Sequence, residues 1–99
     1  MHVVVWEYVV PAEHRAAFEA AYGSGGAWTQ LFRRSPDYRG TTLHANVEAP
    51  GRYLTLDHWT TEGAYVAFCT EHAHEYAAID ALCDELTTRE HRLGTLKLA

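Results

Sequence analysis

Basic residues are scarce in this chain. Lys97 is the only lysine among 99 residues, the seven arginines are scattered, and the formal net charge is −5 with neutral histidines. A protein that binds nucleic acid needs a basic stripe or patch to neutralise phosphates. We therefore expect no nucleic-acid partner.

The chain also lacks a long hydrophobic run. Its first ten residues, MHVVVWEYVV, are apolar, but they include no positively charged leader, contain Glu7 and meet Pro11 early. A signal peptide or membrane span would need a longer apolar stretch. We expect this segment to be a strand of a cytoplasmic protein that has no membrane partner.

Cysteine is sparse as well, and metal motifs are missing. Cys69 and Cys83 form no CxxC pair and fall on apolar positions of a predicted helix, which favours buried free thiols. No HExxH motif or nucleotide-binding glycine loop occurs. We expect neither a bound metal nor an organic cofactor.

The patterns that are present predict a small α+β domain covering residues 1–99. The expected elements are a strand at 2–10, a helix from 11 to 22 with a second one after a GSGG hinge, strands at 38–47 and 52–60, helical residues 61–86 with a break near Thr70, and a strand at 88–98. This order is the split β-α-β-β-α-β arrangement of ferredoxin-like domains. Helices cover one face of such a sheet, yet the first strand is apolar on both faces, so we expect a homodimer joined through the open face.

The hairpin around Glu-Ala-Pro-Gly leaves one question of register open. A slip of one residue decides whether His44 shares a sheet face with His58 or with Asp57 and Trp59. Asp57 and Glu7 fall on the two interior strands, where an unpaired carboxylate is costly. We therefore expect an arginine or a histidine to pair with these acids.

The segment TEHAHEY contains two histidines on a predicted helix. Positions two apart on a helix point about 200° from one another, so His72 and His74 do not bind one ion together. His72 lies on the apolar stripe that includes Tyr65, Phe68 and Tyr76. We expect His72 to face a pocket between the helices and the sheet, and His74 to face solvent.

Four further segments carry a recognisable pattern: the opening strand VVWEYVV, the Trp-x-x-Leu-Phe helix, the Gly-Thr-x-Leu strand and the Arg-Tyr-Leu-Thr-x-Asp-x-Trp strand. Together they resemble the antibiotic biosynthesis monooxygenase domain family. The resemblance implies a dimeric α+β barrel built from ferredoxin-like monomers. The family includes quinone-forming oxygenases without metal or cofactor, haem-degrading enzymes, small aldehyde or quinol oxygenases, and members with no established reaction.

The resemblance favours a small cofactor-independent monooxygenase acting with dioxygen on a phenolic, quinol or polyketide-like aromatic substrate. Such an enzyme needs a base, a donor to the substrate anion and an aromatic wall. His72 or His44 is the candidate base, and Trp59 and Tyr65 match catalytic positions of quinone-forming members. The candidate substrate-binding residues are Trp28, Phe32, His44, Asn46, Phe68 and Tyr76.

Two departures from the family keep other functions open. Thr55 stands where quinone-forming members have an asparagine, and Ile79 lies near the place of their late arginine. Haem-degrading members are matched by Trp59 and His72, but the asparagine of their first strand is missing here. The alternatives are a non-catalytic dimeric module that binds a small aromatic molecule and a haem-binding or haem-degrading protein. The candidate tryptophans and His72 are also compatible with plain core packing.

Overall fold

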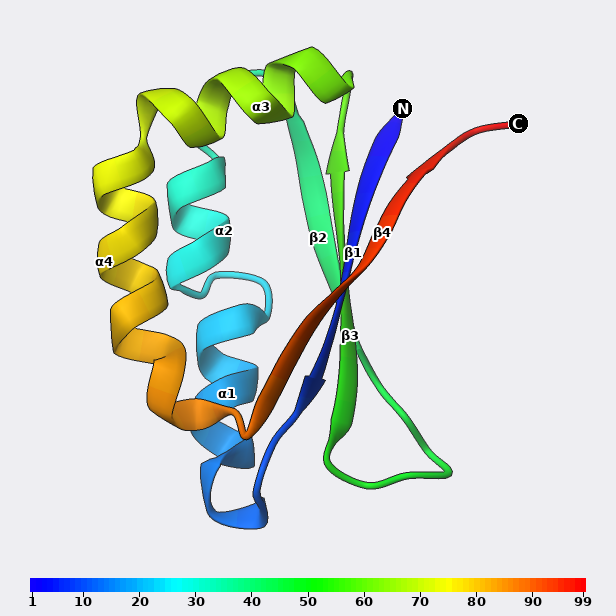
Figure 1. Cartoon of the computed structure of the whole chain (residues 1–99), viewed down its shortest axis with the longest axis vertical. Coiled ribbons are helices and arrows are strands. Elements are labelled where there is room, and N and C mark those ends of the chain that lie inside the picture. The colour runs from blue at the N-terminus through cyan, green and yellow to red at the C-terminus, as the bar shows by residue number, and fades with distance from the viewer.

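The computed structural model describes residues 1–99 as one antiparallel sheet with helices on one side (Figure 1). The elements are β1 (His2–Val9), the 3-10 turn η1 (Ala12–His14), α1 (Arg15–Tyr22), α2 (Ala27–Phe32), β2 (Tyr38–Ala45), β3 (Arg52–Trp59), α3 (Glu62–Glu71), α4 (Ala73–Cys83), the 3-10 turn η2 (Asp84–Leu86) and β4 (Arg89–Lys97). The strand order is β2-β3-β1-β4. The predicted α+β, ferredoxin-like fold is confirmed.

At the hairpin, β2 ends two residues earlier than predicted, for a local reason, whereas β3 begins at the predicted residue. The Asn46 side-chain oxygen accepts hydrogen bonds from the backbone N–H groups of Glu48 and Ala49, at 2.9 and 3.1 Å. Such a side-chain turn competes with the strand ladder and stops it. Gly51 then returns the chain with a φ of 89°, a region that favours glycine.

A close backbone approach explains the glycines between α1 and α2. A Cβ atom at Gly26 would lie 2.3 Å from the carbonyl oxygen of Ala21, in the last turn of α1. Thr29 closes the turn, because its hydroxyl accepts from the Gly25 N–H and donates to the Gly26 carbonyl, each at 3.0 Å. The hinge is therefore a tight turn that brings α2 back against the sheet.

The long helical region changes direction at His72 rather than at Thr70. His72 has φ −109° and ψ 29°, which is not helical, and it separates α3 from α4. Figure 1 shows α3 crossing one end of the sheet and α4 running down beside α2 and α1. Thr61 caps the start of α3, because its hydroxyl oxygen accepts the Ala64 N–H at 3.1 Å. The apolar stripes of the two helices consequently do not form one continuous face.

The core lies between the sheet and the helices and is mostly aromatic. Phe18 of α1 and Trp59 of β3 have no exposed surface. Phe18 stacks on Tyr22 with ring centroids 4.3 Å apart, and it also contacts Tyr8 and Tyr53. No helix of the protein is both long and apolar enough to cross a membrane.

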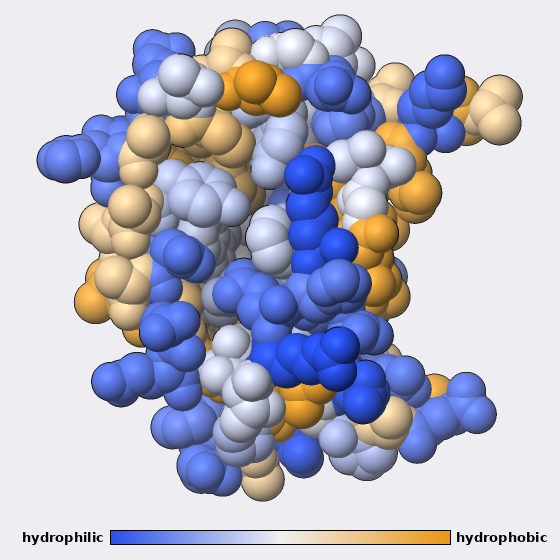
Figure 2. All heavy atoms as spheres, in the orientation of Figure 1, coloured by the Kyte–Doolittle hydropathy of each residue, from blue (hydrophilic) through white to orange (hydrophobic).

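The opposite face of the sheet has no helix over it. Alternation along the paired strands places Val5 of β1 and Leu54 and Leu56 of β3 on this face, with Leu96 of β4 beside them. Figure 2 shows hydrophobic residues gathered on the side of the molecule away from the helices. We call this surface the open sheet face.

Candidate functional site

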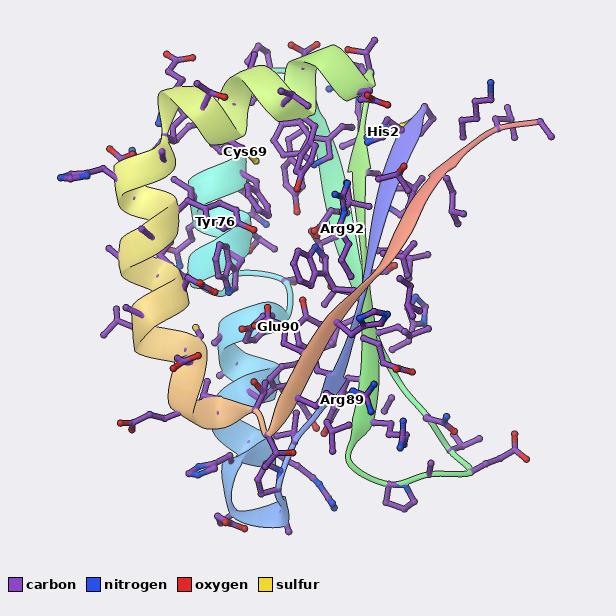
Figure 3. All side chains as sticks on the ribbon, viewed as in Figure 1. His2, Cys69, Tyr76, Arg89, Glu90 and Arg92 are labelled. Atoms are coloured by element: carbon purple, nitrogen blue, oxygen red, sulfur yellow. The ribbon has the colours of Figure 1, made fainter.

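A narrow cavity lies between the helices and the sheet and opens to solvent; the space in it that a water molecule could occupy is about 20 Å³. Six of its lining residues are aromatic, two are threonines and two are acids: Trp6, Tyr8, Tyr22, Trp28, Phe32, Tyr76, Thr41, Thr55, Asp57 and Glu90. No lysine, arginine or histidine lines it. Figure 3 shows Tyr76 on α4 and Glu90 on β4 on opposite sides of this space.

The aromatic wall is held together by ring contacts between neighbouring elements. Tyr8 lies 4.9 Å from Tyr22 and Trp28 lies 4.8 Å from Tyr76, measured between ring centroids. Phe32 bridges towards the sheet, with its ring 6.0 Å from that of Trp28. These contacts join β1, α1, α2 and α4, so the wall is fixed by the core itself.

Asp57 is the only cavity acid on an interior strand, and it is 8% exposed. The Thr41 hydroxyl donates to Asp57 Oδ1 at 2.6 Å. The Tyr38 hydroxyl also contacts Thr41 Oγ1. Because threonine has one hydroxyl hydrogen and gives it to Asp57, Tyr38 must be the donor in this second bond. No protein group donates to Asp57 Oδ2, and the side chain has no salt bridge, so the expected ion pair with arginine or histidine is wrong.

Burial controls the protonation of Asp57. Desolvation raises the pKa of its carboxyl from the ordinary 3.8 to about 6, against the opposing effects of the Thr41 hydrogen bond and of nearby His58. The carboxylate is therefore ionised at neutral pH but takes a proton far more readily than an exposed aspartate. A group with a pKa close to the working pH is suited to act as a general base.

The cavity tyrosines remain neutral hydrogen-bond donors. Burial raises the pKa values of Tyr8, Tyr22 and Tyr76 above their ordinary value of 10.0. The Tyr8 hydroxyl is hydrogen-bonded to Thr55 Oγ1 at 3.0 Å. The Tyr76 hydroxyl has no such partner in the protein, and its pKa is raised in part by the charge of Asp57. The Tyr76 hydroxyl is therefore free to donate a hydrogen bond. It lies close enough to Asp57 for the carboxylate charge to act on it.

Three of the candidate residues line the cavity and three pack beside it. Trp28, Phe32 and Tyr76 are cavity residues, as expected of substrate-binding positions. Trp59, Tyr65 and Phe68 form an adjoining aromatic cluster, with the ring of Trp59 5.6 Å from that of Tyr65 and 5.3 Å from that of Phe68. The indole nitrogens of Trp28 and Trp59 are sealed and have no hydrogen-bond partner, so neither presents a donor to the cavity.

His72 lies in a different place from the one expected. It lines a cleft on the outside of the α3–α4 corner, together with Arg34, Asp37 and Glu71. Its ring centroid is 4.3 Å from that of Phe68, and Nδ1 lies 3.6 Å from the Glu75 carboxylate. The expectation that His72 faces the pocket between helices and sheet is wrong, because the helix breaks at this very residue.

The register of β2 decides on which face of the sheet His44 lies. A bulge between Tyr38 and Gly40, where Gly40 has a φ of 112°, sets His44 opposite Leu54 on the open sheet face. His44 is exposed there and its Nε2 contacts the Thr42 hydroxyl at 3.0 Å. His44 and Asn46 line a shallow cleft on that side, whereas Asp57 faces the helices.

Sequence patterns gave weaker signals for the other cavity residues. Asp57 alternates with Thr55 and Trp59 on a strand, so a carboxylate on the covered face follows once the register is known. No sequence pattern indicates that Glu90 lines the cavity, because β4 shifts register between its pairings with Val5 and Trp6. That shift turns the Glu90 side chain towards the helices, which spacing along the sequence does not reveal.

Comparison with known proteins agrees with the fold. The chain superposes on an 18% identical oxygenase, SnoaB from Streptomyces nogalater, described as cofactor-independent, with a TM-score of 0.71 over 99% of this chain and 92% of that one. It also superposes on a Deinococcus radiodurans protein assigned to the antibiotic biosynthesis monooxygenases, with 16% identity, a TM-score of 0.76 and coverage of 100% and 93%. A conserved protein from Methanosarcina mazei Go1 gives 15% identity, a TM-score of 0.73 and coverage of 99% and 92%.

These structural likenesses, at low identity, concern the fold alone. No curated protein sequence matches the chain significantly. The family model described as antibiotic biosynthesis monooxygenase, however, matches residues 1–78, which is most of the chain. The protein therefore belongs to the antibiotic biosynthesis monooxygenase family.

Proposed function

We propose that the protein is a cofactor-independent monooxygenase that oxidises a phenolic, quinol or polyketide-like aromatic substrate inside the cavity. The observation that carries the proposal is the Asp57 carboxylate, which has one oxygen free of protein donors and lies within an aromatic wall. An apolar, partly enclosed site with a few polar groups is what a small aromatic ligand requires. Membership of the family, which includes the structural relative SnoaB, supports oxygenase chemistry.

The proposed reaction begins with proton transfer. A phenolic hydroxyl donates its proton to Asp57 Oδ2, and the aromatic substrate becomes an electron-rich phenolate. The Tyr76 hydroxyl donates a hydrogen bond to the phenolate oxygen and so stabilises the negative charge away from water. The phenolate then reduces dioxygen directly. One oxygen atom forms the new carbonyl of a quinone, and the other leaves as water with two substrate hydrogens.

Asp57 takes the role that the sequence suggested for His72. A base must lie within hydrogen-bond reach of the proton that it removes, and His72 lies in the outer cleft. In this proposal Trp59 and Tyr65 do not touch the substrate. They pack behind the residues that line the cavity and support them. Phe68 packs on Trp59 in the same way.

We do not extend the proposal to haem. Haem-degrading chemistry needs an axial ligand at the site, and no histidine or cysteine lines the cavity. A non-catalytic module that binds small aromatic molecules would use the same walls, so turnover is the measurement that separates it from an oxygenase.

We also propose that two copies pair through the open sheet face. Leu54, Leu56 and Leu96 would otherwise leave an apolar surface in water, and two such sheets packed face to face form a closed core. His44 lies on this face, so we place it at the interface between copies rather than in a substrate site.

The test uses 1-naphthol and its methyl ether. The wild-type protein is expected to take up dioxygen with 1-naphthol and to form 1,4-naphthoquinone and water, followed with an oxygen electrode and by absorbance. Labelled dioxygen should place one heavy oxygen atom in the product. 1-Methoxynaphthalene has no hydroxyl proton, so it should bind without turnover.

Two variants complete the experiment. Asp57→Asn should bind 1-naphthol but lose at least about a hundredfold in rate, the effect typical of a general base. His72→Ala should keep the wild-type rate. Dioxygen uptake that survives in Asp57→Asn would refute Asp57 as the base. Binding without uptake, for phenols of one to three rings, would instead establish the binding module.

A further inference from the structure

Glu90 of β4 lines the cavity and is exposed to solvent, and the charges of two further exposed acids act on it. These acids are Asp80 of α4 and Asp84 of η2. The pKa of Glu90 is raised first by burial and then by the charges of Asp80 and Asp84, which places the three acids within electrostatic reach of one another. None of them forms a salt bridge, since the only one in the protein joins His72 to Glu75. Unpaired acids at a cleft attract positive charge.

The walls of the cavity suit the same kind of ligand. Trp6 lines the cavity, is partly exposed and stacks on no other aromatic ring. An indole face is the best aromatic partner for a cation, so the Trp6 side of the cavity wall suits a positively charged group. The remaining wall consists of tyrosines, Trp28 and Phe32, a composition typical of sites that hold ammonium groups.

One exposed basic side chain of β4 lies near the cavity without lining it. Arg92 pairs with Trp6 in the strand register, but its charge acts on Tyr65 and Cys69 of α3. In Figure 3 Arg92 lies towards α3, and Glu90 lies further down β4, beside the lower part of the helices. Glu90 thus marks the acidic end of the cavity, and Arg92 lies outside the lining, towards α3.

We propose that the substrate carries a positively charged nitrogen, which Glu90 and the ring of Trp6 hold at the acidic end while the phenolic hydroxyl reaches Asp57. This inference rests on the proposed function and specifies its substrate class as a phenolic amine. The acids are not arranged as a metal site, because no group of three or more metal-binding side chains occurs in the protein. An organic cation fits better, since it needs aromatic faces and diffuse negative charge rather than fixed ligands.

The experiment compares phenols that differ mainly in the charge of the tail. Tyramine, 4-ethylphenol and 3-(4-hydroxyphenyl)propionate are titrated into the wild-type protein at pH 7.5 by calorimetry. Tyramine should bind about tenfold more tightly than 4-ethylphenol, the gain that cation–π contact and an adjacent carboxylate provide. The propionate should bind more weakly than 4-ethylphenol. The preference for tyramine should shrink in 0.5 M NaCl, because salt screens the mouth.

Two variants, expected to change the preference for tyramine in opposite directions, test Glu90 and Arg92. Glu90→Gln should lower the preference for tyramine over 4-ethylphenol about fivefold, because it removes the acid from the mouth. Arg92→Gln should raise that preference, because it removes the cation that pairs with Trp6 in the strand register. Both should leave the affinity for 4-ethylphenol unchanged. Equal affinities for the three wild-type titrations, or a preference that Glu90→Gln does not alter, would overturn the inference.

Phenethylamine, which has the amine but no phenol, separates this inference from the proposed function. If it binds as tightly as tyramine, the acidic end holds the cation as inferred, but the hydroxyl contributes nothing and the proposed phenol chemistry is weakened. If 4-ethylphenol binds and is oxidised as well as tyramine is, the oxygenase stands and the cation inference fails.

Discussion

Replacing Asp57 with asparagine should make the protein more stable and less active. Asp57 is 8% exposed and has no ion pair, and desolvation raises the pKa of its carboxyl from 3.8 to about 6. The native state therefore destabilises the charged form. Asparagine has nearly the same shape, can still accept the Thr41 hydrogen bond, and carries no charge to desolvate.

The pKa shift sets the size and the pH dependence of this effect. Between pH 3.8 and about 6 the native protein binds more protons at Asp57 than the unfolded chain does, so stability falls as the pH rises through this window. One pKa unit corresponds to about 1.4 kcal/mol, which gives a loss of about 3 kcal/mol at pH 7.5 and about half of that at pH 5. Asparagine should recover these amounts.

Urea unfolding of wild type and Asp57→Asn at pH 5 and pH 7.5 measures the effect. The protein concentration must be equal in all four experiments, because pairing of two copies would shift the midpoints. The variant should be the more stable protein at both values, and its advantage should be larger at pH 7.5. An asparagine variant that is less stable, or whose advantage does not grow with pH, would refute the burial of an ionised Asp57.

Three further predictions follow from other parts of the fold. His72→Ala should change the affinity for 1-naphthol less than twofold in a fluorescence titration, because His72 lies outside the cavity; a tenfold loss would place the ligand at the α3–α4 corner. Leu56→Glu should convert a dimer into a monomer in size-exclusion chromatography, since it charges the open sheet face; a monomeric wild type would contradict the proposed pairing. Phe18→Ala should lower the free energy of unfolding by about 3–5 kcal/mol in urea, because Phe18 is fully buried; a loss below about 1 kcal/mol would show that the core refills.

The fold followed from sequence because its signals are local and agree with one another. Alternating residues marked the strands, glycines marked the turns, and the threonine before α3 proved to be its cap. The element order then allowed only a few topologies. The resemblance to the family pointed to the same arrangement, and the family match confirms it.

The site was harder to predict because small irregularities decide which side chains meet. The bulge at Gly40 determines on which face of the sheet His44 lies, and the register shift in β4 turns Glu90 towards the cavity. The break at His72 interrupts a stripe that looks continuous in sequence, so the helical period was applied across a corner. Each irregularity moves a side chain to another face without altering the element order.

The placement of polar groups in the cavity argues for a ligand rather than for plain packing. Asp57 has one oxygen that no protein group satisfies, and the Tyr76 hydroxyl has no hydrogen-bond partner. A core that served stability alone would place apolar side chains at both positions. A phenolic hydroxyl offers one donor and one acceptor, so it can satisfy Asp57 and Tyr76 together. In the proposed function, these two groups give a bound phenol both its orientation and its route to deprotonation.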